Sequence, residues 1–398
     1  MNKPLPNSLS YAKIEAENER EFFMIYTKFA DLSLSMLGMG CMRFPTDANG
    51  EVDMEKTEAL IDLCIERGVN YFDTAWFYHN GKSEEIMGKL LAKYPRESFY
   101  LADKMPFNKF ESHEQVVETF ETQLKRTGLS YFDFYLLHNV SDDTVSIFTD
   151  EKLKIMDFLL EQKSKGRIRH LGFSTHASLP VLEVFLSKYH ERLEFCQIQL
   201  NWLDWQLQKA KEKVALLEKY NLPIWVMEPV RGGKLAKLAD EDEEMLKDAR
   251  PDESIPAWAF RFIQSIPNIK VVLSGMSDRA QVEDNLKTFS ELRPLSSDEE
   301  NMLHAIAKKL IDKKTLTCTN CKYCVPECPR SLPIPKLLRI YNDAVLMPGA
   351  NSVKASSISL PDGKHPADCI GCGACEQKCP QKIEISSVME AFAAKIED

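Results

Sequence analysis

Two copies of one cysteine spacing near the carboxyl terminus constrain the fold of this chain more than any other feature. In each copy two residues separate each of the first three cysteines from the next, and three residues separate the third from a fourth, which precedes a proline. The copies comprise Cys318, Cys321, Cys324 and Cys328, and Cys369, Cys372, Cys375 and Cys379. This spacing is typical of loops that bind cuboidal iron-sulfur clusters. It therefore predicts two [4Fe-4S] clusters in a small domain at the end of the chain.

The duplication also predicts how the thiolates are shared, because the fourth cysteine of each run ligates the cluster of the other run. One cluster would be bound by Cys318, Cys321, Cys324 and Cys379. The other would be bound by Cys369, Cys372, Cys375 and Cys328. Zinc is the alternative, since Cys-x2-Cys pairs also form tetrahedral sites. Four thiolates per run and the proline after the last one fit zinc poorly.

Length and composition indicate a globular protein of two domains. The chain has 398 residues, of which 44% are hydrophobic and 28% charged, and a barrel of about 250 residues leaves room for one small module. The net charge of −10 argues against a nucleic-acid partner, which favours a basic surface. No stretch reaches the apolar length of a membrane helix. The polar first 23 residues lack a secretory signal, which predicts a cytoplasmic protein, and unpaired thiols agree with this.

Short apolar runs alternate with amphipathic stretches through most of the chain, which is the pattern of a parallel sheet with crossover helices. Eight strands are expected, at residues 33–39, 71–73, 99–104, 132–138, 170–174, 195–199, 224–228 and 270–273. The expected strands are separated by stretches whose apolar residues have helical spacing, for example at 56–66, 116–126, 153–165 and 210–220. Eight strand-helix units predict an α/β fold, a (β/α)8 TIM barrel, whose chemistry lies at the carboxyl ends of the strands.

The order of these features predicts four segments. We expect an N-terminal extension over residues 1–23, a barrel over 24–296, a connecting helix over 297–314 and a ferredoxin-like iron-sulfur domain over 315–398. The start of the barrel at Met24 leaves open whether the extension precedes it as an arm or whether translation begins at Met24. A helix expected at 334–346, between the cysteine runs, favours a mainly helical iron-sulfur domain.

Residues at three consecutive strand ends carry a resemblance to a known family. The second expected strand ends at Asp73 and is followed by Tyr78, the third ends at Lys104 and the fourth at His138. With the segments 38–43 and 229–234, they resemble the aldo-keto reductase superfamily over roughly residues 24 to 290. The resemblance is to the subfamily that carries a C-terminal two-cluster [4Fe-4S] ferredoxin-like domain. It implies that these four residues form a catalytic tetrad.

The chemistry of carbonyl reduction explains such a tetrad. Hydride arrives at carbon and a proton at oxygen, so an acid must lie within hydrogen-bond reach of the oxygen. Tyr78 is the expected acid, and an adjacent ammonium from Lys104 is expected to lower its pKa. Asp73 would pair with Lys104 and hold it, while His138 would orient the substrate oxygen.

The resemblance also implies an extended nicotinamide dinucleotide, NADP or NAD, across the carboxyl face of the barrel. Its contacts would come from Ser174, Gln197, Gly232, Gly233, Lys234, Arg279 and Asn285. Arg279 and the two glycines have a plainer interpretation as a surface charge and a tight turn.

This sequence departs from the family's dinucleotide pattern in several places. Thr175 stands where asparagine is usual, so that one contact must be remade by His176 or Asn201. Gly275 and Gln281 stand where a lysine and an arginine usually grip the 2′-phosphate. The grip for NADP is therefore incomplete.

These features favour an oxidoreductase that reduces a carbonyl or oxidises an alcohol in the barrel, with electron transfer through two [4Fe-4S] clusters. Each cluster accepts one electron whereas hydride carries two, which leaves room for a redox partner protein. One alternative is an NAD(P)-dependent carbonyl reductase whose clusters only stabilise the fold. The other is a redox-sensing or docking protein without turnover.

Overall fold

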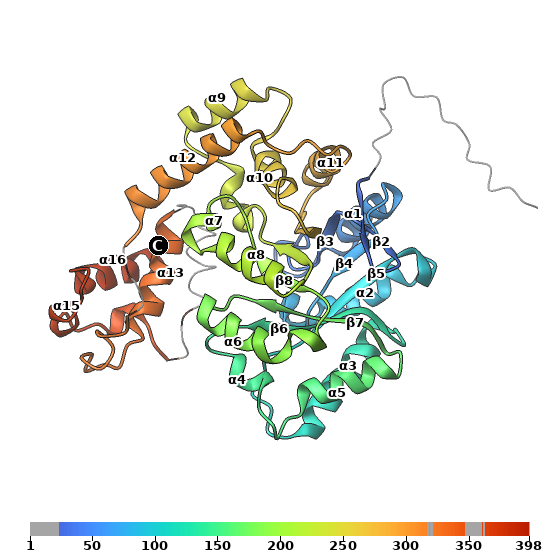
Figure 1. Ribbon diagram of the computed structural model, residues 1–398, viewed down its shortest axis with the longest axis horizontal. Coiled ribbons are helices and arrows are strands. Elements are labelled where there is room, and N and C mark those ends of the chain that lie inside the picture. Colours follow the sequence, from blue (N-terminus) through green and yellow to red (C-terminus); the bar gives the residue numbers. More distant parts are fainter. Residues whose placement is uncertain (1–23, 317, 319–320, 347–359, 361–362, 398) are drawn as a thin grey trace, which may run out of the picture.

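The computed structural model describes residues 24–316, 318, 321–346, 360 and 363–397 (Figure 1). The expected N-terminal extension, residues 1–23, lies outside the described residues.

Eight parallel strands form a closed barrel, which confirms the predicted fold class. They are β3 (Leu37–Gly40), β4 (Tyr71–Asp73), β5 (Tyr100–Met105), β6 (Phe132–Val140), β7 (Ile168–Thr175), β8 (Cys196–Gln199), β9 (Ile224–Met227) and β10 (Ile269–Ser274). Each strand pairs with the next along the chain, and β10 closes the barrel by pairing with β3, with Leu273 opposite Gly38. Aromatic and branched side chains fill the interior, and Trp225, Phe134 and Phe195 are fully buried there. The barrel is therefore a packed core, and only its rim is open to chemistry.

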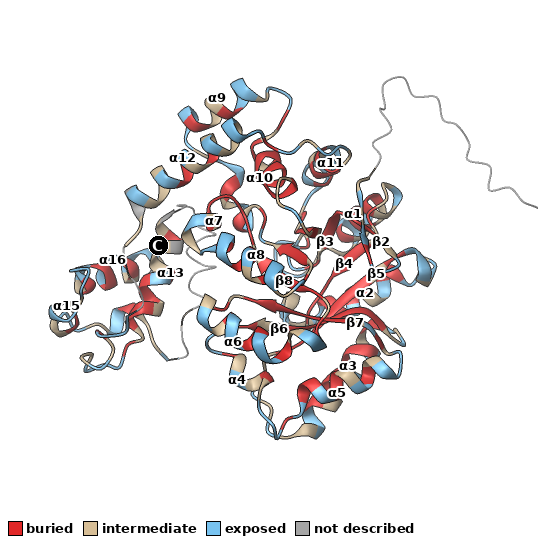
Figure 2. Cartoon of the chain, in the orientation of Figure 1, coloured by how far each residue is buried: buried red, intermediate tan, exposed pale blue. Residues whose placement is uncertain are grey.

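Helices surround the strands and shield their outer faces, as the burial colours of Figure 2 show. The longer ones are α1 (Met54–Glu66), α2 (Ser83–Leu91), α3 (His113–Thr127), α5 (Ile155–Ser164), α6 (Leu179–Tyr189), α8 (Ala210–Lys219), α9 (Asp240–Ala249), α10 (Ile255–Gln264) and α11 (Arg279–Thr288). Short helices α4 (Val145–Phe148) and α7 (Asp204–Leu207) lie in the loops after β6 and β8.

The first expected strand, residues 33–39, is wrong in one respect, because the structure divides it into two elements. Residues Leu32–Ser35 form β2, which pairs antiparallel with β1 (Tyr26–Phe29), and only β3 belongs to the barrel. The hairpin closes the end of the barrel opposite the carboxyl face. Its Phe29 ring packs edge-on against Trp225 with centroids 5.0 Å apart. The division follows from this packing, since Phe29 covers apolar rings that would otherwise meet water.

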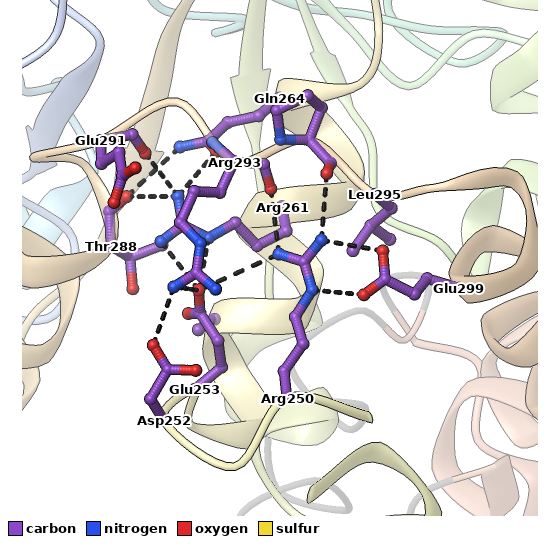
Figure 3. Close-up of polar contacts among 12 residues, drawn as sticks. Arg250, Asp252, Glu253, Arg261, Gln264, Thr288, Glu291, Arg293, Leu295 and Glu299 are labelled. Atoms are coloured by element: carbon purple, nitrogen blue, oxygen red, sulfur yellow. Dashed lines mark hydrogen bonds and ion pairs between the residues drawn. The ribbon is translucent and has the colours of Figure 1, made fainter. Parts of the chain in front are cut away.

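The connecting helix α12 (Ser297–Lys314) is attached to the barrel by partly buried charges (Figure 3). Arg250 donates to both carboxylate oxygens of Glu299, in the first turn of α12, at 2.5 and 2.8 Å. Next to it, Arg261 pairs with Glu253 at 2.9 Å. Ser296 caps the helix in a reciprocal capping box with Glu299. Leu303 and neighbouring apolar residues of α12 pack into the barrel core.

After Thr315 a second, separate hydrophobic core begins. Its regular elements, within the described residues, are all helical: α13 (Ile334–Leu346), α15 (Ala374–Gln377), α16 (Ile385–Glu397) and the short 3-10 turn η5 (Pro366–Asp368). Their core is formed by Leu332, Ile334, Leu337, Leu338, Ile340, Ala344, Ile383, Ile385, Val388, Met389 and Phe392, with Cys324 and Cys375. The predicted small, mainly helical domain is confirmed, and the helix expected at 334–346 has the predicted bounds.

Helix α13 lies next to the connecting helix α12 and to the barrel. Within the domain, the Asn342 side chain makes two hydrogen bonds, of 2.7 and 2.9 Å, with the backbone of Leu316, just after α12. Lys336 on α13 forms an ion pair of 2.9 Å with Asp143, in the loop after β6. Helix α13 therefore lies on the side of the domain that meets the barrel (Figure 1). None of the helices in the described part of the chain has the length and apolarity needed to cross a membrane.

Candidate functional site at the carboxyl face of the barrel

A buried ion pair joins the ends of β4 and β5. The Lys104 ammonium lies 2.6 Å from a carboxylate oxygen of Asp73 and 2.7 Å from the carbonyl oxygen of Thr74. Both charged side chains are almost fully buried. Burial alone would lower the pKa of Lys104, but the charges of Asp73 and Tyr78 raise it above its usual value. Lys104 is therefore held as a cation in a fixed position.

Tyr78 reaches this ion pair from an unusual turn. It begins the 3-10 segment η1 (Tyr78–Gly81), in which His79, Asn80 and Gly81 have φ angles of 51°, 56° and 83°. The His79 ring stacks on Phe44 at 5.0 Å and accepts a hydrogen bond from the Phe44 backbone N–H at 3.3 Å. These contacts hold the turn so that the Tyr78 ring centroid lies 5.0 Å from the Lys104 ammonium.

The acidity of Tyr78 differs from the sequence-based expectation. Burial raises its pKa to about 12, and Lys104 opposes this shift without overcoming it, while Asp73 adds to it. Lys104 thus lowers the pKa of Tyr78 as expected, but burial has the larger effect and the pKa is raised overall. The physical reason is that a buried phenolate is poorly solvated, and the Asp73 charge also raises the pKa. The phenol is protonated at neutral pH, as an acid that donates to a carbonyl oxygen must be.

His138, on β6, is the fourth member of the group that the structure brings together. Its ring lies edge-on to Tyr78 with centroids 6.1 Å apart. Burial, then the charges of Lys104 and His176, hold the pKa of His138 well below its usual value, so the imidazole is neutral. Its buried Nδ1 has no hydrogen-bond partner among the described residues. An uncharged hydrogen-bonding group is thus available to a ligand.

Aromatic rings form one wall of the site. Phe77, 41% exposed, packs on Phe107 with ring centroids 4.8 Å apart. Phe107 in turn lies 5.5 Å from the His138 ring. Trp76, which precedes Phe77 in the sequence, stacks under the Arg126 guanidinium of α3 at 4.1 Å. The wall is therefore formed by Phe77 and Phe107, and no sequence motif singles out Phe107.

Two of the residues expected to contact the nicotinamide lie buried at this rim. The hydroxyl of Ser174 accepts a hydrogen bond of 2.8 Å from the backbone of Asn139. Gln197 directs its amide nitrogen to the sulfur of Met227 at 3.8 Å. Within the described residues, the buried Oε1 of Gln197 and Oδ1 of Asn139 lack partners. These atoms fit the recognition of a carboxamide, because a buried acceptor without a donor is costly unless a ligand supplies one.

Thr175 and Asn201, which stand at the altered part of the dinucleotide pattern, both make hydrogen bonds within the protein. The Thr175 hydroxyl donates to the Val140 carbonyl at 2.7 Å and accepts from Ala177, so it closes a turn. The amide nitrogen of Asn201 donates hydrogen bonds to Asp204 and to the Glu228 carbonyl, and its amide oxygen accepts from two backbone N–H groups. Asn201 is therefore engaged within the protein.

The remaining expected cofactor residues are spread around the rim. Gly232 and Gly233 have φ angles of 67° and 90° in the turn η4 (Arg231–Ala236), which also contains Lys234. Asn285 is buried and donates to the Ser274 hydroxyl at 3.0 Å. Arg279 is 71% exposed along its side chain and pairs with Glu283 at 2.7 Å. It is thus an exposed charge on α11, in agreement with the plainer of its two interpretations.

Arg43 lies against Gly275, at the position where the family usually has a lysine that contacts the 2′-phosphate. A Cβ atom at Gly275 would lie 3.1–3.2 Å from the Arg43 stem, and one at Gly232 would lie 3.1 Å from its guanidinium. The glycine at 275 therefore leaves room for a cation that comes from the loop after β3. Sequence reasoning missed Arg43, because its position over Gly275 depends on two distant loops.

The cysteine runs enclose two separate cavities. One is bordered by Cys318, Cys321, Cys324 and Cys379. The other is bordered by Cys328, Cys369, Cys372 and Cys375. In the described part of the chain, no three Cys, His, Asp or Glu side chains converge closely enough to hold a single metal ion. Four thiols thus surround each cavity, three from one run and the last from the other.

Backbone conformation is similar in both cysteine runs. Gly373, after the second cysteine of its run, has a φ of 68°, and Gly371 has a φ of 67°. Lys322, at the position equivalent to Gly373, has a φ of 65°. The first run therefore adopts the same left-handed turn without glycine.

Comparisons with known proteins agree with this geometry. Residues 36–308 match the model of the aldo/keto reductase family, and residues 317–384 match that of a 4Fe-4S dicluster domain. The NADH-specific methylglyoxal reductase of Escherichia coli (strain K12) is 26% identical over 70% of this chain and 97% of its own length. L-galactose dehydrogenase of Arabidopsis thaliana is 24% identical over 68% of this chain and 89% of its own.

Among solved structures, the holo form of aldo-keto reductase AKR11C1 from Bacillus halodurans is similar to this chain. The two share 26% sequence identity with a TM-score of 0.58, over 71% of this chain and 96% of the other. The similarity thus covers the barrel.

Proposed function

The chain belongs to the aldo/keto reductase family of oxidoreductases and ends in a 4Fe-4S dicluster domain, and from this premise we propose that it interconverts a small carbonyl compound and an alcohol in the barrel, with electron transfer through its clusters. The observation that carries the proposal is the buried group at the strand ends. Tyr78 stands beside the fixed Lys104–Asp73 pair and a neutral His138.

In this proposal each member of the tetrad has one task. Tyr78 donates its proton to the carbonyl oxygen as negative charge develops there. Lys104, held by Asp73, stabilises the phenolate that remains. His138 orients the same oxygen through a hydrogen bond from its neutral ring. A bound nicotinamide dinucleotide supplies or accepts the hydride.

The side chains at the rim fit such a dinucleotide. Gln197, Asn139 and Ser174 would hold the carboxamide, and the turn at Gly232 and Gly233, with Lys234 and Asn285, would hold the remainder. Arg43 would place a cation near the phosphates. Arg279 is already paired with Glu283, and Gln281 bonds to Asp278 at 2.8 Å. We therefore favour NAD over NADP, which agrees with the NADH specificity in the name of the Escherichia coli relative.

The two thiol-lined cavities fit two [4Fe-4S] clusters, each with three cysteines from one run and the fourth from the other. Two clusters together store two electrons, which is the number of electrons that one hydride carries. Exposed Cys321 and Cys372 bring an edge of each cavity to the surface, where a redox partner protein would exchange electrons.

A second candidate is a carbonyl reductase whose clusters only stabilise the fold. It is favoured by one observation, that Cys324 and Cys375 lie within the hydrophobic core of the domain. In that case substitution of Cys372 lowers stability without changing the rate of aldehyde reduction.

Replacement of Tyr78 tests the proposed chemistry. Tyr78→Phe removes only the acidic hydroxyl and is expected to lower kcat for aldehyde reduction by about 10²–10⁴-fold, the usual contribution of a general acid. Binding of NADH, followed by its fluorescence, should be retained. Tyr189→Phe, on α6, is the matched control. Equal rates for Tyr78→Phe and wild type would reject the assignment and favour a sensing or docking protein without turnover.

A further inference from the structure

The backbone of Lys104 is held by two buried side chains that have no task in the tetrad. The Lys104 N–H donates to the Asp103 carboxylate at 2.8 Å. The Lys104 carbonyl accepts a hydrogen bond of 3.0 Å from the side-chain amide of Gln123, on α3. Asp103 and Gln123 are both fully buried. The strand end that carries Lys104 is therefore fixed through its backbone as well as through its ammonium.

Gln123 is also the centre of a buried hydrogen-bond network. Its amide nitrogen donates a second hydrogen bond, of 2.9 Å, to a carboxylate oxygen of Glu84, in the first turn of α2. Its amide oxygen accepts a hydrogen bond from the hydroxyl of Tyr135, on β6. Glu84 and Tyr135 are fully buried as well. Because both the donor and the acceptor of this amide are paired, the network favours a single arrangement of these side chains.

Arg126 extends the network to the segment that carries Tyr78. Its guanidinium donates to the other carboxylate oxygen of Glu84 at 2.8 Å. The central carbon of the same guanidinium lies 4.1 Å from the centroid of the Trp76 ring. Trp76 precedes Tyr78 by two positions. One chain of contacts therefore joins the end of β5 to the segment before Tyr78.

A close approach of α2 and α3 explains why these side chains meet. A Cβ atom on Gly88 would lie 2.4 Å from the Thr127 carbonyl oxygen, so a larger residue would push the two helices apart. Glu84 precedes Gly88, and Gln123 precedes Thr127, by one helical turn, so each lies on the contacting face of its helix. The helix contact thus brings the Glu84 carboxylate to the Gln123 amide.

We propose that Gln123, Glu84 and Arg126 are positioning residues, which hold Lys104 and Tyr78 in the alignment that proton transfer from Tyr78 to the carbonyl oxygen requires. This rests on the proposed carbonyl chemistry and extends it beyond the tetrad. Gln123 contacts Lys104 through the backbone and Arg126 contacts Trp76, so both act through other residues. Such alignment matters because a displacement of about 1 Å can lower a rate by about 100-fold.

Gln123→Met and Arg126→Met test the proposal in the complete protein with its clusters, purified without oxygen. Each is expected to lower kcat for aldehyde reduction by about 10- to 100-fold, while the dissociation constant of NADH, measured by fluorescence, stays unchanged. Arg126→Lys keeps a cation beside Glu84 and should recover part of the lost rate. Because the Arg126 side chain is partly exposed, its variants test the network even where Gln123→Met folds poorly.

The matched control is Gln162→Met. Gln162, on α5, is a buried glutamine whose amide oxygen accepts a hydrogen bond of 2.9 Å from Arg167. Its loss removes a comparable contact elsewhere in the barrel and should leave kcat at the wild-type value.

A double variant distinguishes positioning from a general loss of structure. If the network acts only through the pair of Lys104 and Tyr78, Gln123→Met should lower kcat little further in Tyr78→Phe, because effects of residues that act as a unit are not additive. Full multiplication of the two losses would contradict the positioning role. Wild-type kcat in both Gln123→Met and Arg126→Met, with a slow Tyr78→Phe, would reject the positioning role alone and leave the proposed reaction standing.

Hydrogen exchange gives a second measurement that needs no turnover. The backbone amides of residues 73–82 and 100–105 should exchange faster in Gln123→Met and Arg126→Met than in wild type, because the contacts that hold these segments are lost. Gln162→Met should leave both segments unchanged. Unchanged exchange in both segments of both variants overturns the inference. If wild type reduces no aldehyde, the proposed reaction fails, and hydrogen exchange alone decides whether the network holds these segments.

Discussion

The rings of Tyr78 and His138 lie edge-on, with their centroids 6.1 Å apart. The surroundings of both rings disfavour a charge. Burial is the largest influence on both pKa values, raising that of Tyr78 to about 12 and holding that of His138 well below its usual range. Both groups are therefore neutral across the physiological range. The only fixed charges of the tetrad belong to Lys104 and Asp73, which neutralise each other.

This electrostatic state predicts a flat pH dependence. The acid, Tyr78, keeps its proton until the pH approaches its pKa of about 12, and His138 gains a proton only below its usual pKa. We expect kcat/KM for aldehyde reduction to show no break assignable to either residue between about pH 6 and pH 10. His138→Gln should lower the rate without changing the shape of the profile. A descending limb near pH 8 that disappears in Tyr78→Phe would contradict this account.

At this scale the sequence predicts which residues meet but not how they are used. The strand ends placed Tyr78, Lys104, Asp73 and His138 at one rim because parallel strands in a barrel end on one face. The engagement of Arg279 with Glu283 could not be foreseen, since a partner four residues away on an exposed helix competes equally with a ligand.

At the scale of elements, α12 links the barrel to the iron-sulfur domain through the carboxylate of Glu299. Its hydrogen bonds to Arg250 are the main reason that its pKa falls to about 2, while burial opposes the shift. Because the folded state lowers this pKa, the interaction stabilises the protein above the unfolded pKa of about 4.5. The stabilisation is lost as the pH falls from there toward 2.

Glu299→Gln tests this link. We expect it to lower the free energy of unfolding by about 2 kcal/mol at neutral pH, the value of charge-assisted hydrogen bonds that are partly buried. In urea titrations followed by tryptophan fluorescence, the difference from wild type should shrink as the pH falls below about 4.5. Glu283→Gln, which removes an exposed pair, should change stability by less than about 1 kcal/mol. A difference that persists unchanged at pH 3 would argue against a role for the Glu299 charge.

Sequence periodicity alone does not predict where β2 ends and β3 begins. Alternation of apolar residues continues from β2 into β3, so residues 33–39 resemble one strand. The break depends on Phe29, which closes the barrel floor against Trp225, and no local pattern around residue 36 encodes that distant contact.

At the scale of the whole molecule, each cluster site combines the two ends of the iron-sulfur domain. The cavities group Cys379 with the first run and Cys328 with the second, as the cluster-binding spacing predicts. The position of α13 against the barrel was not predictable, because it depends on Lys336 and Asp143, which are far apart in sequence.

Single cysteine substitutions test the grouping. Cys379→Ala is expected to perturb the same cluster as Cys321→Ala, and Cys328→Ala the same cluster as Cys372→Ala, because partners border one cavity. Iron analysis and EPR of the reduced variants should show two phenotypes, each with one cluster of about four irons retained. Cys64→Ala, in the barrel core, should keep both clusters. Shared phenotypes for Cys379→Ala and Cys372→Ala would show that each run binds its own cluster.

The most direct test of the account follows the clusters by EPR during aldehyde turnover without oxygen. The protein should contain about eight irons, and reduction by methyl viologen should produce cluster signals. We predict that adding an aldehyde with NAD discharges these signals and yields the alcohol in wild type, whereas in Tyr78→Phe the signals persist. Alcohol formation from NADH at an unchanged rate while the clusters stay reduced, or after their removal, would contradict electron transfer between the two domains.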